Sequence, residues 1–122
     1  MTPQEILIAA RAKIADEANW CKGALARDIN GDDKPDSHEH SEFIFWEGLQ
    51  GNDPMSCRWC ALGAVQAVIG DDHIPYAVRS PLEKAARNLF QAKTIADLND
   101  GLGHVAVMQC YDAAIKMVGE TP

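Results

Sequence analysis

Four polar residues along the chain could together perform nucleophilic catalysis. Cys60 stands at the predicted start of an apolar helix, where the helix dipole would lower the pKa of its thiol. His104 could then act as the general base, and Asn99 or Asp100 could orient its ring. No glycine-rich segment suited to an oxyanion hole precedes Cys60, and Gly103 favours His104 as the first residue of a helix. The set therefore predicts a cysteine-dependent hydrolase only as an alternative.

The same cysteine belongs to a Cys-x-x-Cys pair, Cys57 and Cys60, which could hold zinc or cycle as a dithiol. Zinc needs two further ligands, and none of the remaining cysteines and histidines has a convincing spacing. The redox function requires a βαβ context, which the sequence lacks. The simpler interpretation places Cys60 in the core as a small apolar residue and Cys57 in the preceding loop. The remaining residues of these two types are Cys21, His38, His40, His73, His104 and Cys110.

An acidic stretch over residues 28–39 carries oxygen ligands at the spacing of an EF-hand calcium loop. Two residues oppose this interpretation: Asp33 stands where the loop needs glycine for a sharp turn, and Pro35 lacks a backbone N–H. A solvated acidic loop is the simpler interpretation, so we expect no cofactor, with calcium as the alternative. The ligands would be Asp28, Asn30, Asp32, Asp36 and Glu39.

Aromatic residues gather in the segment that follows, at Phe43, Phe45 and Trp46. Aromatic side chains are enriched at binding hot spots, so an exposed cluster of them would be a contact surface. We expect the other two tryptophans, Trp20 and Trp59, to be core anchors instead. The sequence therefore predicts that Phe43, Phe45 and Trp46 bind an unidentified protein or small ligand.

Helical patterns surround these candidate sites. Thr2, Pro3 and Glu5 form a start signal that predicts a helix to about residue 19. We expect residues 20–26 to continue this helix or to form a second short one. Residues 27–40 are predicted to form a polar loop, and residues 43–46 a strand or one helical turn. Further helices are predicted over residues 58–69, over 80–90 from a second start signal at Ser80, over 94–99, and from His104 to residue 118.

The 122-residue chain is acidic, with 11 basic and 18 acidic side chains and a formal net charge of −7. Nucleic acids and anionic membranes favour clustered lysine and arginine, so both are disfavoured as direct partners. The N-terminus lacks the pattern of a signal peptide, and no apolar stretch reaches the roughly 20 residues that span a membrane. Four cysteines without an export signal predict reduced thiols in the cytoplasm.

Five short motifs occur in order along most of the chain: Trp20-x-x-Gly23-Ala24, Arg27-Asp28-x-x-Gly31, Trp59-Cys60-Ala61-Leu62-Gly63-Ala64, Asn99-Asp100 and Ala114-Ile115. This pattern resembles an uncharacterised family of bacterial and phage proteins, a domain of unknown function with a Trp-Cys-x-x-Gly-Ala helix and a downstream Trp-Asn-Asp turn. The chain departs from it at Leu98, where the family has tryptophan, and residues 36–56 look like a protein-specific insertion. The resemblance implies no established activity and no catalytic residues.

Together these patterns predict one mainly α domain over residues 1–122. Its expected architecture is a compact orthogonal bundle of four or five helices, with at most one short strand pair near residues 43–46. We expect a non-enzymatic interaction or ligand-binding protein that is compatible with a homo-oligomer. A hydrolase using Cys60 and His104 and a calcium-stabilised module are the alternatives.

Overall fold

The computed structural model describes residues 1–33 and 48–119, and five α-helices form most of this part of the chain. The helices are α1 (Pro3–Lys13), α3 (Ala61–Ile69), α4 (Tyr76–Phe90), α5 (Ile95–Leu102) and α6 (His104–Gly119). A short 3-10 helix, η1 (Glu17–Asn19), and an antiparallel pair of strands, β1 (Ala26–Arg27) and β2 (Arg58–Trp59), complete it. The mainly α fold class with one short strand pair is therefore confirmed.

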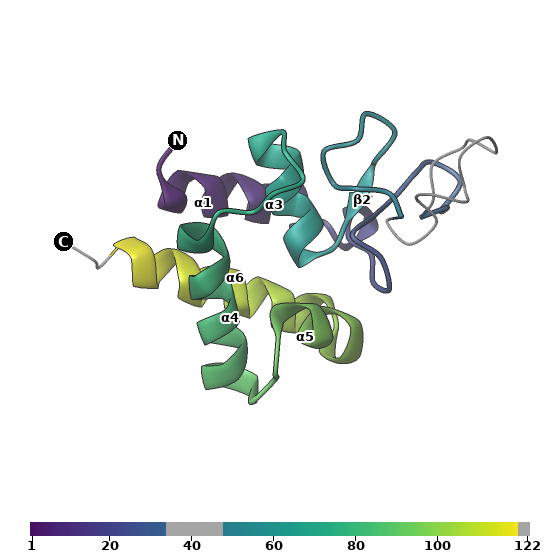
Figure 1. The fold of residues 1–122 in the computed structure, drawn as a ribbon. Helices are drawn as coiled ribbons and strands as arrows, with labels where there is room; N and C mark the ends of the chain where they lie inside the picture. The colour runs from purple at the N-terminus through teal and green to yellow at the C-terminus, as the bar shows by residue number, and fades with distance from the viewer. Residues whose placement is uncertain (34–47, 120–122) are drawn as a thin grey trace.

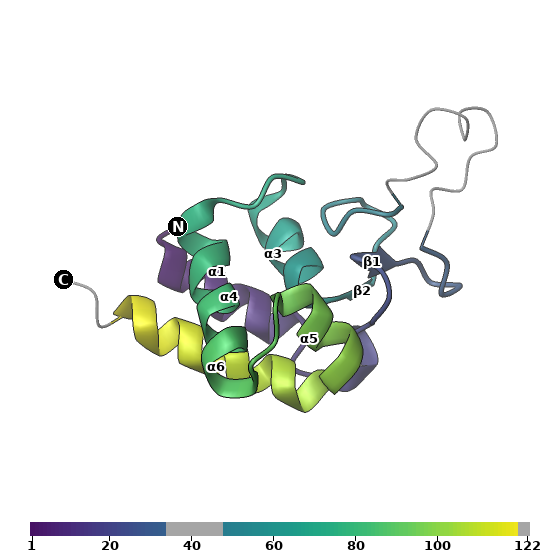
Figure 2. The same ribbon diagram turned by 60° about the horizontal axis from the view of Figure 1, so that its bottom comes forward.

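Helix α6 forms the centre of the bundle and packs against α1, α4 and α5, while α1 also packs against α3 (Figure 1). The buried face of α6 carries Val107, Cys110 and Tyr111, none of which is accessible to solvent. The start of α1 and the end of α6 lie at one end of the molecule, and the strand pair lies at the other (Figure 2). Among the described helices, none combines the length and the apolar character needed to cross a lipid bilayer.

Helix α1 begins where the sequence predicts, because the signals at its start are local. The Thr2 hydroxyl accepts from the Glu5 backbone N–H at 3.1 Å, and the Glu5 carboxylate accepts from the Thr2 N–H at 2.7 Å. The helix does not reach residue 19 as predicted. It ends at Lys13, and Asp16 caps the separate turn η1 by accepting from the Ala18 N–H at 2.9 Å. The aspartate thus competes with continuation of the helix.

The prediction of helix over residues 20–26 is wrong, because the backbone of this segment pairs with the backbone at Trp59. The Cys21 N–H donates to the Trp59 carbonyl at 3.1 Å, and Gly23 adopts a positive φ of 80°. Ala26 then pairs with Trp59 across the β1–β2 ladder. Strand β2 therefore replaces the predicted start of helix at residue 58, and α3 begins only at Ala61. Residues 43–46, where the strand pair was expected, lie outside the described part.

Helix α4 begins four residues before the predicted start at Ser80, and Pro81 lies inside it. Proline in a helix interior removes one backbone hydrogen bond. The first turn of α4, which precedes Ser80, is stabilised by the burial of Val78 in the core. This burial favours helix before the proline.

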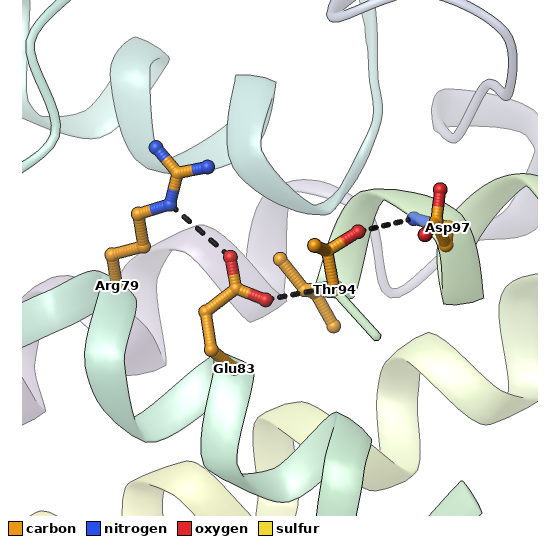
Figure 3. Close-up of polar contacts among 5 residues, drawn as sticks. Arg79, Glu83, Thr94 and Asp97 are labelled. Carbon is orange, nitrogen blue, oxygen red and sulfur yellow. Dashed lines mark hydrogen bonds and ion pairs between the residues drawn. The ribbon is translucent and has the colours of Figure 1, made fainter. Parts of the chain in front are cut away.

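The α4–α5 junction is fixed by two capping contacts (Figure 3). The Thr94 hydroxyl accepts from the Asp97 N–H at 3.0 Å, as the predicted short helix requires, although α5 extends to Leu102 rather than residue 99. The Glu83 carboxylate of α4 accepts from the Ile95 N–H at 2.5 Å. Its other oxygen accepts from Arg79 at 3.2 Å, so Glu83 joins two helices.

We expect Glu83→Gln to lower the free energy of unfolding by about 1 kcal/mol, because a charged acceptor at the start of α5 becomes a neutral one. Urea unfolding would measure this loss. Arg79→Gln is the matched control, since it breaks only the more exposed ion pair and should cost less than about 0.5 kcal/mol. Equal losses in the two variants would show that the ion pair, not the cap, is the stabilising contact.

Candidate functional site

Asn99 of α5 is a buried side chain that connects three separate segments. Its amide oxygen accepts from the indole N–H of Trp20 at 2.8 Å and from the Ala61 backbone N–H at 3.0 Å. Its amide nitrogen donates to the Cys21 carbonyl and to the Asp100 carboxylate, each at 3.1 Å. All four hydrogen-bonding positions of the amide are thus used within the protein. The arrangement fixes the start of α3 against residues 20–21.

Asp100 is exposed, but one of its two carboxylate oxygens is held in place. Oδ1 accepts from the Gly23 backbone N–H at 2.8 Å and from Asn99 at 3.1 Å. Oδ2 has no partner among the described residues, and no lysine, arginine or histidine of that part forms an ion pair with Asp100. A fixed carboxylate with one open oxygen is therefore available to a ligand.

Cys60 caps the N-terminus of α3 and is 7% exposed. Its Sγ accepts from the Gly63 N–H at 3.3 Å, and its backbone N–H donates to the Leu25 carbonyl at 3.0 Å. Burial raises the pKa of the Cys60 thiol, although the hydrogen bond from Gly63 acts in the opposite direction. The predicted lowering of this pKa by the helix terminus is therefore wrong, because loss of solvation outweighs the N–H donors.

A small pocket of about 210 Å³ opens beside these side chains, between α3 and α5. Three segments line this α3–α5 pocket: residues 23–25, residues 60–62, and the α5 residues Ala96, Asn99 and Asp100. Figure 2 shows the start of α3, the strand pair and α5 gathered in this region. A cavity of about 150 Å³ holds a benzene molecule, and drug-sized ligands occupy about 300–1,000 Å³. The α3–α5 pocket therefore suits a group the size of one side chain.

His104 lies at the start of α6, where the sequence predicts it, but its contacts lie away from the pocket. Nε2 is 2.6 Å from the Ile14 carbonyl, so this nitrogen carries the proton. The ring is 5.6 Å from that of Trp20. The described structure thus brings Cys60, Asn99 and Asp100 to one pocket and shows no hydrogen bond from His104 to any of them. The catalytic hypothesis stays a prediction.

The Cys-x-x-Cys pair is divided between core and surface. Cys60 is buried and Cys57 is half-buried, with the Cys57 N–H donating to the Arg27 carbonyl at 3.0 Å. Cys21 and Cys110 are also buried, and all four thiols are free. In the described part, no three His, Cys, Asp or Glu side chains gather as a metal site. His38 and His40 lie outside that part, so the zinc alternative remains a prediction.

Asp28, the first ligand of the predicted calcium loop, is buried and closes a local turn. Its carboxylate accepts from the backbone N–H groups of Asn30 and Asp32, each at 2.9 Å. The side chains of Asn30 and Asp32 are exposed, and Asp36 and Glu39 lie outside the described residues. The calcium hypothesis therefore stays untested beyond this turn.

The predicted contact residues Phe43, Phe45 and Trp46 lie outside the described residues, so this hypothesis remains a prediction. The later part of the predicted insertion, residues 48–56, is described and is anchored to α3. The Gly51 N–H donates to the Gln66 side chain at 2.7 Å, and the Gly51 carbonyl accepts from the Trp59 indole N–H at 2.9 Å.

The raised pKa values of two buried thiols predict a loss of stability at alkaline pH. Burial raises the pKa of Cys21 to about 12 and that of Cys110 to about 11. Thiols of the unfolded chain lose their protons near pH 8.5, whereas these two keep theirs in the folded protein. Their contribution to the free energy of unfolding is therefore complete below that pH and is lost as pH rises toward the folded pKa. We expect Cys21 and Cys110 each to lower the free energy of unfolding by about 1.4 kcal/mol per pH unit between about pH 9 and 10.

Urea unfolding at pH 8, 9 and 10 would measure this slope. Cys110→Ala removes one titrating thiol, and no hydrogen bond of that side chain is found among the described residues. The stability of the variant should therefore fall less steeply with pH, by about 1.4 kcal/mol per pH unit, which corresponds to one proton. An unchanged slope would exclude Cys110 as a source of the pH dependence.

Comparison with known proteins identifies a family but no activity. The model of a family of unknown function, DUF6197, matches residues 1–117. No curated protein and no solved structure matches the chain significantly.

Proposed function

Because the chain belongs to the family of unknown function DUF6197, we propose a function from its own geometry: a non-enzymatic binding domain. The α3–α5 pocket would take up one side-chain-sized group, from a small ligand or from a partner protein. Residues 43–46 remain our proposal for a wider contact surface on a protein partner.

The single observation that carries this proposal is a pocket built on a rigid frame. The buried side chain of Asn99 ties α5 to the start of α3 and to the Cys21 carbonyl, and its hydrogen bonds hold it in one position. Such preorganised walls reduce the entropy lost when a ligand binds. The mostly apolar lining and the open oxygen of Asp100 fit the usual composition of a ligand site.

The state of the polar side chains favours binding over catalysis. A thiol with a raised pKa is a poor nucleophile at neutral pH, because little thiolate is present. The amide of Asn99 has no free acceptor with which to orient a histidine ring N–H and no free donor with which to stabilise an oxyanion. We therefore assign Cys60 and Asn99 a structural role in the frame of the pocket.

Filling the pocket tests the proposal. Ala96→Phe places a large ring on an exposed residue of α5 that lines the pocket, so we expect folding to be retained and binding to be lost. The measurement is a nuclear magnetic resonance titration with small apolar fragments that follows the Gly23, Cys60 and Ala61 amides. Ala12→Phe, on the exposed face of α1, is the matched control and should bind as the wild type does.

The proposal fails if no fragment shifts these three amides in the wild-type protein. It also fails if Ala96→Phe and Ala12→Phe bind equally well, because binding would then lie elsewhere.

A further inference from the structure

We infer that the α3–α5 pocket recognises a primary ammonium group carried on a short apolar stem. The inference rests on the proposed binding function and names the ligand chemistry. A free alkylamine and a lysine side chain share this chemistry.

The head group follows from the two oxygens of Asp100. Oδ1 already accepts from the Gly23 N–H and from Asn99, which leaves Oδ2 as the open acceptor. A guanidinium ion prefers both oxygens of a carboxylate, in a bidentate pair, whereas an ammonium ion is a point charge that needs only one. One held and one open oxygen therefore favour ammonium over guanidinium.

No cation of the described part neutralises Asp100. The nearby guanidinium of Arg27 donates to the Gly31 and Lys22 carbonyls at 3.1 and 2.9 Å. Asp100 forms no ion pair with it, and the chain carries a net charge of −7. An incoming cation therefore finds an unpaired carboxylate on an acidic protein, which also favours its approach.

The stem follows from the walls of the pocket. Leu25, Leu62 and Ala96 provide apolar surface beside Asp100, within a volume of about 210 Å³. A chain of about four methylene groups, as in lysine, buries its stem on such surface and presents its charged end to the rim.

The test is a titration of the wild-type protein with n-butylammonium, n-butylguanidinium and n-butanol, following the Gly23 amide by nuclear magnetic resonance. We expect n-butylammonium to bind about three- to ten-fold more tightly than n-butanol and more tightly than n-butylguanidinium. Asp100→Asn should remove this preference, since asparagine can still accept from the Gly23 N–H but carries no charge. Asp97→Asn removes a charge from the same helix outside the pocket and should keep the preference.

Capped tripeptides with a central lysine or norleucine distinguish the two sources. Tighter binding of the lysine peptide than of the free amine would identify a protein side chain, and the reverse would identify a small amine; both support the inference. Equal binding of n-butanol and n-butylammonium would overturn the inference and leave the pocket function standing. Preferred binding of the guanidinium would overturn it as well. Loss of the ammonium preference in Asp97→Asn would likewise overturn it, while absence of all binding would overturn the proposed function.

Discussion

Gly63→Ala is expected to lower the free energy of unfolding by about 3 kcal/mol or more. A Cβ atom on Gly63 would overlap the backbone carbonyl of Leu25, which crosses α3 at this point. On another side, Gly51 lies so close that its own Cβ would overlap the Gly63 carbonyl. Because the obstacles are backbone atoms, no rotamer change can relieve the overlap. Helix α3 and the segment that carries Leu25 would have to separate.

Gly101→Ala is the matched control for this substitution. Gly101 lies within α5, has no positive φ, and has no neighbour within 4 Å of an added Cβ. Alanine should therefore leave stability unchanged or raise it by up to about 1 kcal/mol. Urea unfolding of the two variants gives the comparison, and similar small effects in both would contradict the close backbone crossing at Gly63.

Asn99→Ala is expected to lower the free energy of unfolding by about 3–5 kcal/mol. The substitution leaves the Trp20 indole N–H, the Ala61 N–H and the Cys21 carbonyl without the partner that each now has. A buried polar group left unpaired costs about 1–3 kcal/mol; the Ala61 N–H and the Cys21 carbonyl are buried, and the Trp20 indole N–H is partly buried. The loss is comparable to the whole stability of a small domain.

Asn52→Ala provides the control, because Asn52 is exposed and no side-chain hydrogen bond of it is found in residues 1–33 and 48–119. Its effect should be within about 0.5 kcal/mol. Denaturation followed by circular dichroism would measure both variants. A stable, cooperatively folded Asn99→Ala protein would contradict the framework role given to this side chain.

Local signals predicted the parts of the fold that depend on local contacts. The capping residues Thr2 and Thr94 act over three positions, so their helices could be predicted from sequence. The strand at Trp59 could not be, because its pairing with Trp20 and Ala26 joins distant segments. The early start of α4 likewise depends on the burial of Val78, which no local pattern shows.

The candidate site was predictable in its residues but not in their roles. Cys60 and Asn99 were selected for their chemistry, yet three of the four hydrogen bonds that saturate Asn99 join it to residues 38 to 79 positions away in sequence. Residues 23–25 and Ala96, which line the pocket, carry no chemical signal at all. The one available signal was glycine within the predicted apolar helix at Gly63, which suggests a close backbone approach.

The most direct test of the ammonium assignment is a crystal structure of the wild-type protein with n-butylammonium at saturating concentration. The geometry predicts the ammonium nitrogen within hydrogen-bonding distance of Asp100 Oδ2 and the butyl chain between α3 and α5. An empty α3–α5 pocket, or an amine bound only elsewhere on the surface, would contradict the assignment of this pocket as an ammonium site.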